Sequence, residues 1–331
     1  MSGLPRIWLL LGHRRGDNNQ LLALGEALGL PFETRTLAYR RSARLIMRLL
    51  PSSIAHLTAA SRATLGPPWP DLVIGIGRRS VPVARWIKAM SGDKAGIVRL
   101  GHPRAPSNWF DLVLTTPQYP VPEAPGVVTL PLALNRFRDP PAPTHDEQTL
   151  LDSLPRPHVL LSLGGTAPMW RLDLEQLDGA LAKMLRSTKR EGGTLLVAPS
   201  PRTPVDAINR VSEAIANAPN ARLLGPDVRY PVAVADADEH VVTADSVSMI
   251  SEAIVTGKPV GLIPVRRDLR GRLRLGGDPE GNALRDPRRF WRHVEALGLA
   301  GTVDAPRKGH VPDPLAIAVA EVRRRFALLF D

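Results

Sequence analysis

The sequence predicts an α/β protein of two Rossmann-like domains, each with a parallel sheet and helices on both faces. Three observations predict it: a length of 331 residues, apolar runs that alternate with helical patterns, and one proline-rich stretch near the middle. A chain of this length exceeds what a single hydrophobic core usually serves, so two domains are expected. Runs that alternate in this way are typical of βαβ units.

The N-terminal half begins the alternation. Short apolar runs that stand before polar loops predict strands at residues 7–11, 71–76, 94–100 and 110–115. Helical patterns follow the first two runs, at residues 21–30 and 81–90. Residues 1–135 are therefore predicted to form an N-terminal Rossmann-like domain.

The C-terminal half repeats the pattern after a linker, predicted over the proline-rich residues 136–157. Strands are expected at residues 158–163, 194–198, 221–224, 240–243 and 259–264, and helices at residues 172–189, 205–216 and 247–256. Residues 158–311 are thus predicted to form a C-terminal Rossmann-like domain, with a ligand cleft between the two domains. A helix over residues 312–331 ends the chain, and packing back on the N-terminal domain is one arrangement open to it.

The composition restricts the kind of site. The absence of cysteine excludes a disulfide framework, a thiolate metal site and a cysteine nucleophile. Lys and Arg outnumber Asp and Glu by 43 to 32, a formal net charge of +11. Such a surplus fits a nucleotide phosphate or an anionic membrane surface as partner, and a solvated arginine-rich surface is the plainer interpretation. No helix-turn-helix, zinc-finger or RNP pattern is present, so no nucleic acid partner is expected.

No stretch of the sequence reaches 18 apolar residues, and the run at residues 7–11 is too short for a signal peptide. We therefore expect a cytoplasmic protein, with a peripheral place at the inner face of the membrane as an alternative. The alternative rests on YRRSARLIMRLL, residues 39–50, where Arg40, Arg44 and Arg48 share one helical face and apolar residues share the other. Burial of that apolar face in the protein's own core competes with it.

The most informative segment is VVTADSVSMISEAIVTGKPVGLIP, residues 241–264, which predicts a strand, a polar turn and a helix. Asp245 or Ser246 can cap the helix, and the free N–H groups of its first turn form an anion site. Glu252 lies two turns into the helix. A carboxylate can accept two hydrogen bonds from a vicinal diol, whereas the plainer interpretation of Glu252 is a solvated helix residue.

Two further loops follow predicted strands of the C-terminal half. In LLSLGGTAPMW (160–170), Gly164 and Gly165 allow close approach of a ligand, Thr166 adds a hydroxyl and Trp170 a stacking surface. In isolation a structural turn explains the glycines equally well. In APSPRTP (198–204), Ser200, Arg202 and Thr203 follow a strand, where Arg202 can meet a phosphate or a base. A surface arginine in a proline-rich turn is the alternative.

The loop LGHRRGDNNQ (11–20) carries the candidates for acid–base chemistry in the N-terminal half. His13 and Asp17 qualify by residue type as general bases toward an acceptor hydroxyl. Helix capping by Asp17 or Asn18 is the competing explanation. Three further polar loops are expected nearby, at residues 77–80, 102–104 and 116–119.

These pieces together resemble the GT-B glycosyltransferases, and more narrowly the mitochondrial fission ELM1-like family of predicted nucleoside-diphosphate-sugar enzymes. The matching pieces are, in order, GHRRGDNNQ, GIGRRS, HPR with FDLV, TPQY, LGGT, SPRT and TADSVSMISEAIVTGKP. The resemblance covers nearly the whole chain and implies the GT-B fold and a nucleoside-diphosphate-sugar donor, which we expect to be of the UDP type.

The resemblance also implies roles for the domains and for single residues. Residues 1–135 would form the acceptor-side domain and residues 158–311 the nucleotide-sugar-binding domain. Glu252 would bind the ribose hydroxyls, and the glycine loop would lie near the diphosphate. Backbone groups of Pro226 and Asp227, or the ring of Tyr230, would lie near the base. The full set expected at the donor is Gly164, Gly165, Thr166, Ser200, Arg202, Thr203, Tyr230, Asp245, Ser246, Ser248, Met249 and Glu252. Most GT-B enzymes need no metal, so neither a metal nor a cofactor beyond the donor is expected.

The reaction predicted first is transfer of a sugar from the nucleotide donor to an acceptor, with a membrane- or envelope-associated acceptor in view. An epimerase acting on a nucleotide-sugar is the second possibility. A non-catalytic GT-B scaffold in membrane dynamics is the third. The identity of the sugar and the acceptor, and the oligomeric state, do not follow from the sequence.

Overall fold

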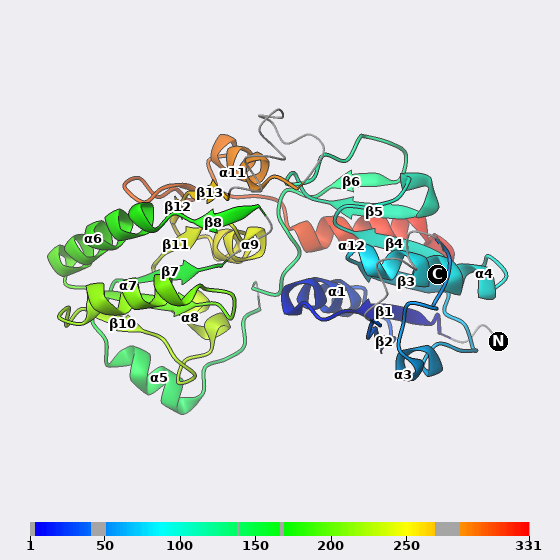
Figure 1. Ribbon diagram of the computed structural model, residues 1–331, viewed down its shortest axis with the longest axis horizontal. Coiled ribbons are helices and arrows are strands. Elements are labelled where there is room, and N and C mark those ends of the chain that lie inside the picture. Colours follow the sequence, from blue (N-terminus) through cyan, green and yellow to red (C-terminus); the bar gives the residue numbers. More distant parts are fainter. Residues whose placement is uncertain (1–3, 41–50, 138, 166–168, 269–284, 331) are drawn as a thin grey trace. The chain divides into compact units, whose positions relative to one another are not determined.

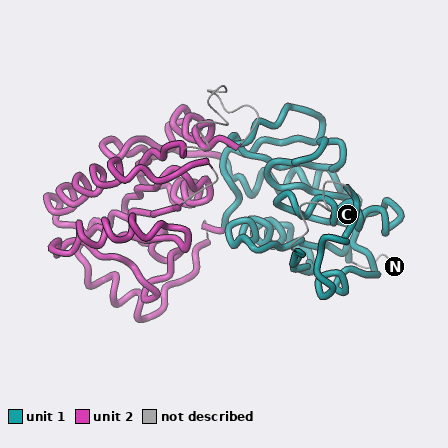
Figure 2. The backbone as a smooth tube through the Cα atoms, viewed as in Figure 1, with its two compact units in different colours: residues 1–135, 312–331 teal, residues 136–311 magenta. Residues whose placement is uncertain are grey.

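The computed structural model describes residues 4–40, 51–137, 139–165, 169–268 and 285–330. The chain divides into two compact units, unit 1 with residues 1–135 and 312–331, and unit 2 with residues 136–311 (Figure 2). Thr166 and residues 41–50 of the basic amphipathic segment lie outside the described residues. Among the described helices, none is both long enough and apolar enough to cross a bilayer.

Within the described part of unit 1, six strands form one parallel sheet in the order β2-β1-β3-β4-β5-β6 (Figure 1). The strands are β1 (Ile7–Leu11), β2 (Phe32–Thr36), β3 (Leu72–Ile76), β4 (Gly96–Leu100), β5 (Leu112–Thr115) and β6 (Val127–Thr129). The α-helices are α1 (Arg15–Ala27), α3 (Ala59–Ala63), α4 (Val81–Met90) and α12 (Pro314–Arg325). The 3-10 turns are η1 (Arg78–Ser80), η2 (Ser107–Trp109) and η3 (Ala327–Leu329).

Strand β1 shows why the central strands read as continuous apolar runs. Ile7 and Leu9 join one core cluster with α1 and α12, and Trp8 and Leu10 join another with α4. Both faces of the strand are buried because helices cover both faces of the sheet. The edge strand β2, FETRT, was not predicted, because its mostly polar residues lack an apolar run.

The C-terminal segment packs within unit 1. Ala318 and Val322 of α12 are fully buried in the cluster that holds Leu21 of α1. A Cβ atom at Gly96 of β4 would lie 2.3 Å from Cε1 of Phe326, so the strand and the segment after α12 touch directly. The last helix is therefore an integral part of the N-terminal unit's core.

Within the described part of unit 2, six strands form a parallel sheet in the order β10-β9-β7-β11-β12-β14, and β8 pairs with β13 in an antiparallel ribbon. The strands are β7 (His158–Leu163), β8 (Trp170–Leu172), β9 (Thr194–Pro199), β10 (Ala221–Leu223), β11 (Glu239–Thr243), β12 (Val260–Ile263), β13 (Val265–Arg267) and β14 (Gly301–Thr302). The helices are α5 (His145–Asp152), α6 (Leu174–Glu191), α7 (Val205–Ile215), α8 (Tyr230–Asp236), α9 (Val247–Val255) and α11 (Pro287–Ala296).

The stretch that the sequence predicts as a linker, residues 136–157, lies in unit 2 and contains α5. Thr144 and Glu147 form a capping box at its first turn, and Leu151 is buried in the core cluster with α8. Glu147 also accepts hydrogen bonds from Arg229, at 2.8 Å from Nε and 2.6 Å from Nη2. A short helix with its own cap, tied to α8 by an ion pair, thus replaces the expected free linker.

Candidate functional site

The unit 2 sheet has a topological switch point between β7 and β11. The chain leaves β7 toward β9 and β10 on one side, and leaves β11 toward β12 and β14 on the other. In open parallel sheets, ligands bind beyond the carboxyl ends of the two strands where the order reverses. The turns that follow β7 and β11 are therefore where a ligand of unit 2 is expected.

The turn after β7 is held by side chains from the turn after β11. Gly164 N–H donates to Thr243 Oγ1 at 2.7 Å, and Gly165 N–H donates to Asp245 Oδ2 at 2.9 Å. A Cβ atom at Gly164 would lie 2.2 Å from Asp245 Oδ1. Glycine is therefore required here by the close approach of the Asp245 carboxylate.

Asp245 is a buried member of this turn and is not the cap of α9. It is 1% exposed, and Thr243 Oγ1 donates to its Oδ1 at 2.9 Å. Burial raises the pKa of Asp245, while the Gly165 N–H and the Thr243 hydroxyl work against that rise. Ser246 caps α9 instead, since its hydroxyl accepts the Met249 N–H at 3.4 Å. Of the two predicted caps the structure uses Ser246, because Asp245 is taken up by the glycine turn.

The turn after β9 packs against the same glycines. A Cβ atom at Gly165 would lie 2.0 Å from the main-chain oxygen of Arg202. Thr203 Oγ1 lies 2.6 Å from the Gly164 carbonyl oxygen and accepts the Ser200 N–H at 2.8 Å. Thr203 and Ser200 thus hold the loop together through their own hydrogen bonds. These bonds leave the two hydroxyls little capacity to bind a ligand.

Arg202 is the basic side chain of this edge that solvent can reach. Its side chain is 54% exposed, and Nη2 lies 3.9 Å from Asp245 Oδ2. At that distance the carboxylate orients the guanidinium without a direct hydrogen bond. The Arg202 fork therefore keeps donors for a phosphate.

Glu252, Tyr230 and Ser162 form a second polar group beside the turns. The Tyr230 hydroxyl donates to Ser162 Oγ at 3.4 Å, and the Glu252 carboxyl lies close enough to Tyr230 for each to shift the pKa of the other. Burial raises the pKa of Glu252 to about 7, and the nearby Tyr230 hydroxyl opposes the rise. Burial also raises the pKa of Tyr230 well above its ordinary value, and the nearby Glu252 carboxylate adds to it.

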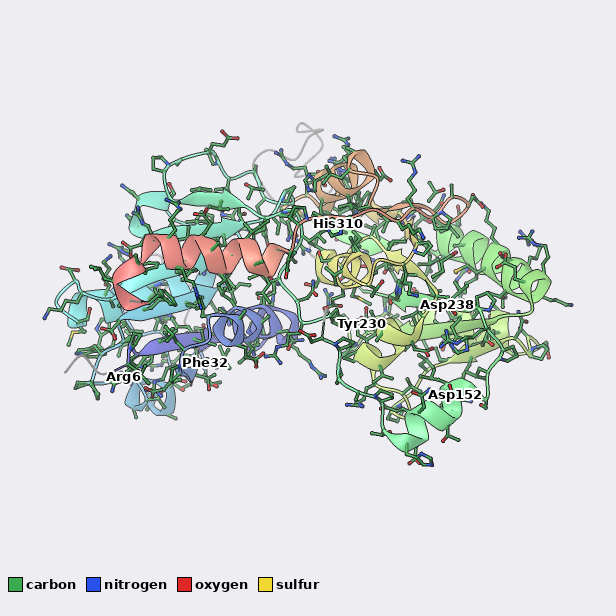
Figure 3. The ribbon with its side chains drawn as sticks, turned by 180° about the vertical axis from the view of Figure 1, so that it is seen from behind. Arg6, Phe32, Asp152, Tyr230, Asp238 and His310 are labelled. Carbon is green, nitrogen blue, oxygen red and sulfur yellow. The ribbon has the colours of Figure 1, made fainter. Side chains whose placement is uncertain are left out.

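The alternation of β7 explains this grouping. Val159, Leu161 and Leu163 point to the face covered by α6 and α7, whereas Leu160 is in the cluster with α8. Ser162 lies two residues after Leu160 and so faces α8, where Tyr230 is the first residue. In Figure 3, Tyr230 and Asp238 lie apart along the sheet, which agrees with Tyr230 contacting the fifth residue of β7 and Asp238 its first.

Sequence reasoning missed three residues at this edge: Ser162, Arg285 and Trp291. Trp291 Nε1 of α11 donates to the Ala244 carbonyl at 2.6 Å, and Arg285 Nη2 donates to the Asp245 carbonyl at 3.4 Å. Neither belongs to a recognisable motif. Ser162 had a signal, because it is the one hydroxyl within the apolar run HVLLSL.

Trp170 is not the exposed stacking surface that the sequence suggests. It is 2% exposed, and its ring packs edge-on against Trp291 with centroids 6.2 Å apart. The guanidinium of Arg288 covers it at 5.3 Å from the ring centroid. The pairing of β8 with β13 carries Trp170 into the core of unit 2.

The remaining predicted donor residues lie on α9. Ser248 is half-buried in the first turn, and Met249 is 9% exposed. Glu252 follows one turn after Ser248, so both lie on neighbouring parts of one face. The helix thus brings Ser248 and Glu252 onto one face, whereas Met249 is buried with the apolar residues of the helix.

In unit 1, Asp17 and His13 have different surroundings. Asp17 is half-buried in the first turn of α1, and its Oδ2 lies 3.9 Å from where a Cβ of Gly77 would stand. His13 is exposed and makes no hydrogen bond with the described residues. Asn18 closes the loop by a pair of bonds to Gly12, at 2.8 and 2.9 Å. Asp17 therefore lies beside the loop after β3, whereas His13 is exposed to solvent.

The family model described as "Mitochondrial fission ELM1" matches residues 15–278. The mitochondrial fission protein ELM1 of Arabidopsis thaliana is 26% identical over 247 residues, which cover 65% of this chain and 56% of that protein. The chain therefore spans little more than half the length of this curated relative.

Solved structures resemble the whole chain. S. aureus MnaA in a co-structure with UDP has a TM-score of 0.54 at 11% identity, over 99% of this chain and 98% of that one. The UDP-GlcNAc 2-epimerase of Methanocaldococcus jannaschii has a TM-score of 0.53 at 13% identity, over 98% and 100%. The enzyme of the same name from Neisseria meningitidis, bound to UDP-GlcNAc, has a TM-score of 0.51 at 11% identity, over 98% and 100%. This likeness confirms the predicted GT-B fold.

Proposed function

This chain belongs to the mitochondrial fission ELM1 family, and we propose that its unit 2 binds a nucleoside diphosphate sugar of the uridine type. The observation that carries the proposal is the Glu252 carboxyl of α9, which is held beside Tyr230 and Ser162 near the switch-point turns. The Tyr230 hydroxyl donates to Ser162, so the oxygens of Glu252 keep lone pairs for a ligand. A ribose 2′,3′-diol supplies the two donors that would engage them.

The diphosphate is assigned to Arg202 and to the first turn of α9. The N–H groups of Gly164 and Gly165 already donate to Thr243 and Asp245, so the glycines shape the site and bind no phosphate. Helix N-terminal N–H groups and an exposed guanidinium are suited to a leaving diphosphate. The expectation that no metal is needed stays a prediction.

The proposed reaction is transfer of the sugar to an acceptor hydroxyl. The bond between the sugar's anomeric carbon and the diphosphate oxygen breaks, and the acceptor oxygen bonds to that carbon. The nucleoside diphosphate leaves with the electron pair, and a base in unit 1 takes the acceptor proton. Asp17 is our candidate for that base, because it lies beside the loop after β3, and His13 is the alternative.

Nucleotide binding is tested by thermal shift and calorimetry with UDP, UDP-GlcNAc, GDP and ADP. A ligand at a hundredfold excess over its Kd stabilises the folded state by about 2.7 kcal/mol. Glu252→Ala is expected to abolish the UDP shift, and Glu213→Ala, an exposed glutamate on α7, is the matched control. An unchanged UDP affinity in Glu252→Ala, or no shift with any nucleotide, would refute the site.

Two other functions use the same donor site and are separated by product analysis. The fold neighbours named UDP-GlcNAc 2-epimerases favour an epimerase as second candidate, which would change the sugar without an acceptor. The family's name favours a scaffold that binds nucleotide without turnover. Sugar transferred to an acceptor, an epimerised nucleotide-sugar, and unaltered substrate are the three distinct outcomes.

A further inference from the structure

The loops at the carboxyl edge of the unit 1 sheet meet around one residue that no motif singled out, Arg99 of β4. Its side chain is 2% exposed. Nη1 donates to the Gly77 carbonyl and to Ser80 Oγ, both at 3.1 Å, and Nη2 donates to the His102 carbonyl at 3.0 Å. Arg99 therefore ties the loop after β3 to the loop after its own strand.

The charge of Arg99 has no direct counter-ion among the described residues. Its three acceptors are neutral oxygens, and Nε finds no hydrogen-bond partner in the described part of the chain. Burial lowers the pKa of Arg99 to about 10, and Tyr119 and Asp17 are the main groups that oppose this. A buried cation without a paired anion is costly, so such a group usually has a functional reason.

More positive charge follows strands β1, β3 and β4 along the chain. The arginines that follow these strands are Arg14, Arg15, Arg78, Arg79 and Arg104. In the described part of unit 1, the ion pairs involve other residues, and none joins a carboxylate to these five arginines. Asp17, in the first turn of α1, acts on Arg99, and Asp111 at the end of the loop after β4 pairs with Lys88, so this edge carries a net positive charge.

His102 adds a neutral donor to this edge. Its Nδ1 accepts the main-chain N–H of Arg104 at 2.9 Å, and its ring packs edge-on against Tyr119. Burial, with Arg104 and Arg99 nearby, lowers the pKa of His102 to about 4, so the ring is neutral at pH 7. Because Nδ1 accepts, the single ring proton sits on Nε2, which has no partner among the described residues.

The backbone at Arg104 is built to maintain this arrangement. Arg104 has a φ of 59°, in the left-handed region that non-glycine residues rarely adopt. That conformation points its N–H at His102 Nδ1, and its side chain remains exposed. Strain of this kind clusters at ligand-binding sites.

We propose that the carboxyl edge of the unit 1 sheet binds a phosphoryl group, with His102 Nε2–H and Arg104 as its donors and Arg99 as the buried positioning residue. A phosphoryl group, with its double charge and several acceptor oxygens, matches an arginine fork and an imidazole N–H that the same loop after β4 supplies. Calling this group part of the acceptor rests on the proposed transferase function, whereas the binding itself does not.

The test uses the full chain with inorganic phosphate as the probe. Phosphate binding is measured by the line width of the phosphorus NMR signal and by calorimetry. Arg104→Gly removes the guanidinium, and glycine adopts the left-handed backbone without strain. His102→Asn keeps an oxygen near the Nδ1 position but lacks the Nε2–H, whereas His102→Gln places its amide near Nε2. We expect Arg104→Gly and His102→Asn each to weaken phosphate binding about tenfold, and His102→Gln to weaken it less.

Controls separate this site from the diphosphate site of unit 2. Arg190→Ser, whose side chain is 77% exposed on α6, should leave phosphate affinity unchanged. Phosphate affinity that survives Arg104→Gly but disappears in Arg202→Ser would overturn the proposal. Equal loss in His102→Asn and His102→Gln with unchanged melting would also overturn the assigned tautomer. The proposed function fails separately, through the UDP shift of Glu252→Ala.

Two arms identify the source of the phosphoryl group. Glycerol 3-phosphate represents a soluble phosphate ester, and neutral vesicles carrying a small fraction of phosphatidic acid represent a lipid headgroup. Binding of either ligand that weakens in Arg104→Gly supports the site and names its source. If glycerol 3-phosphate, the phosphatidic acid vesicles and inorganic phosphate all fail to bind, the proposed phosphoryl site is refuted.

Discussion

The imidazole Nδ1 of His158, the first residue of β7, lies 2.6 Å from Oδ2 of Asp236, the last residue of α8. Nε2 of the same ring lies 3.1 Å from the Leu154 carbonyl oxygen. A carboxylate and a carbonyl both accept hydrogen bonds, so both ring nitrogens must carry hydrogen. His158, which is fully buried, is therefore an imidazolium paired with Asp236.

This pair predicts that stability depends on pH. Burial alone lowers the pKa of His158, but the hydrogen bonds to Asp236 and Leu154 outweigh it and raise the pKa overall. Folding then favours the protonated ring, so the stabilisation is complete below the unfolded pKa of about 6.5 and is lost as pH rises through the folded pKa. His158→Gln should cost about 1–3 kcal/mol of unfolding free energy at pH 6 and less at pH 9.

Urea unfolding of wild type and His158→Gln across pH 5.5–9 measures this difference. His145→Gln, an exposed histidine on α5, is the control and should change little. A cost that stays constant over the whole range would mean that folding leaves the pKa of His158 unchanged, and a cost that grows as pH rises would mean that His158 folds as a neutral ring.

Glu252 predicts a second loss of stability as pH rises, which has a different cause: burial of the carboxyl group instead of an ion pair. Burial raises its pKa to about 7, so folding favours the protonated acid and the ionised carboxylate destabilises the fold increasingly from about pH 4.5 to pH 7. Glu252→Gln should therefore stabilise the protein at pH 8 by an amount on the order of 1–3 kcal/mol. If the carboxylate binds a ribose diol, UDP affinity of the wild type should rise through pH 7. A flat affinity profile from pH 6 to 8 would argue against that role.

Gly165 predicts a steric test of the switch-point turn. Gly165→Ala places a Cβ 2.0 Å from the Arg202 main-chain oxygen, which must move the loop after β9. We expect a loss of about 1–3 kcal/mol and weaker UDP binding. Gly179→Ala is the matched control, because nothing lies within 4 Å of its new Cβ in the middle of α6. That change should stabilise by about 0.5–1 kcal/mol, and a neutral Gly165→Ala would contradict the packing.

Gly96 tests the docking of the C-terminal segment. Gly96→Ala would place a Cβ 2.3 Å from Phe326 Cε1, so the Phe326 ring must move away from β4. Destabilisation by about 1–3 kcal/mol is expected, with earlier proteolysis of the C-terminal segment. Gly66→Ala, with open space around its Cβ, should leave the cleavage pattern unchanged. If Phe326→Ala rescues Gly96→Ala, the clash is confirmed as the cause.

The basic amphipathic segment at residues 39–50 predicts membrane contact, and residues 41–50 lie outside the described residues. Each cation near an anionic surface contributes about 1 kcal/mol. Co-sedimentation with anionic vesicles, lost at high salt and in an Arg40/Arg44/Arg48→Ser variant, is the expected result. Equal recovery in the supernatant with and without anionic vesicles would refute membrane docking.

Local patterns were enough for the buried parallel strands and their turns. The runs at β1, β7 and β9 are apolar because helices cover both faces, so each strand is visible in the sequence without its partners. The edge strand β2 and the helix α5 were not, since one is polar and the other stands among prolines. In α5 the capping box of Thr144 and Glu147 was a readable signal that the prolines obscured.

The fold class, the family resemblance and the loops that carry polar side chains could all be predicted from the sequence. Which of those side chains already have hydrogen-bond partners depends on how the chain packs. Asp245 and Thr203 hold turns together, whereas Glu252 and Arg202 keep capacity for a ligand. Arg99 gave no local signal, since an arginine in an apolar strand has meaning only through the loops that surround it. Hydrogen-bond partners come from residues distant in the chain, so a motif identifies donors and acceptors, and only packing shows which of them are already satisfied.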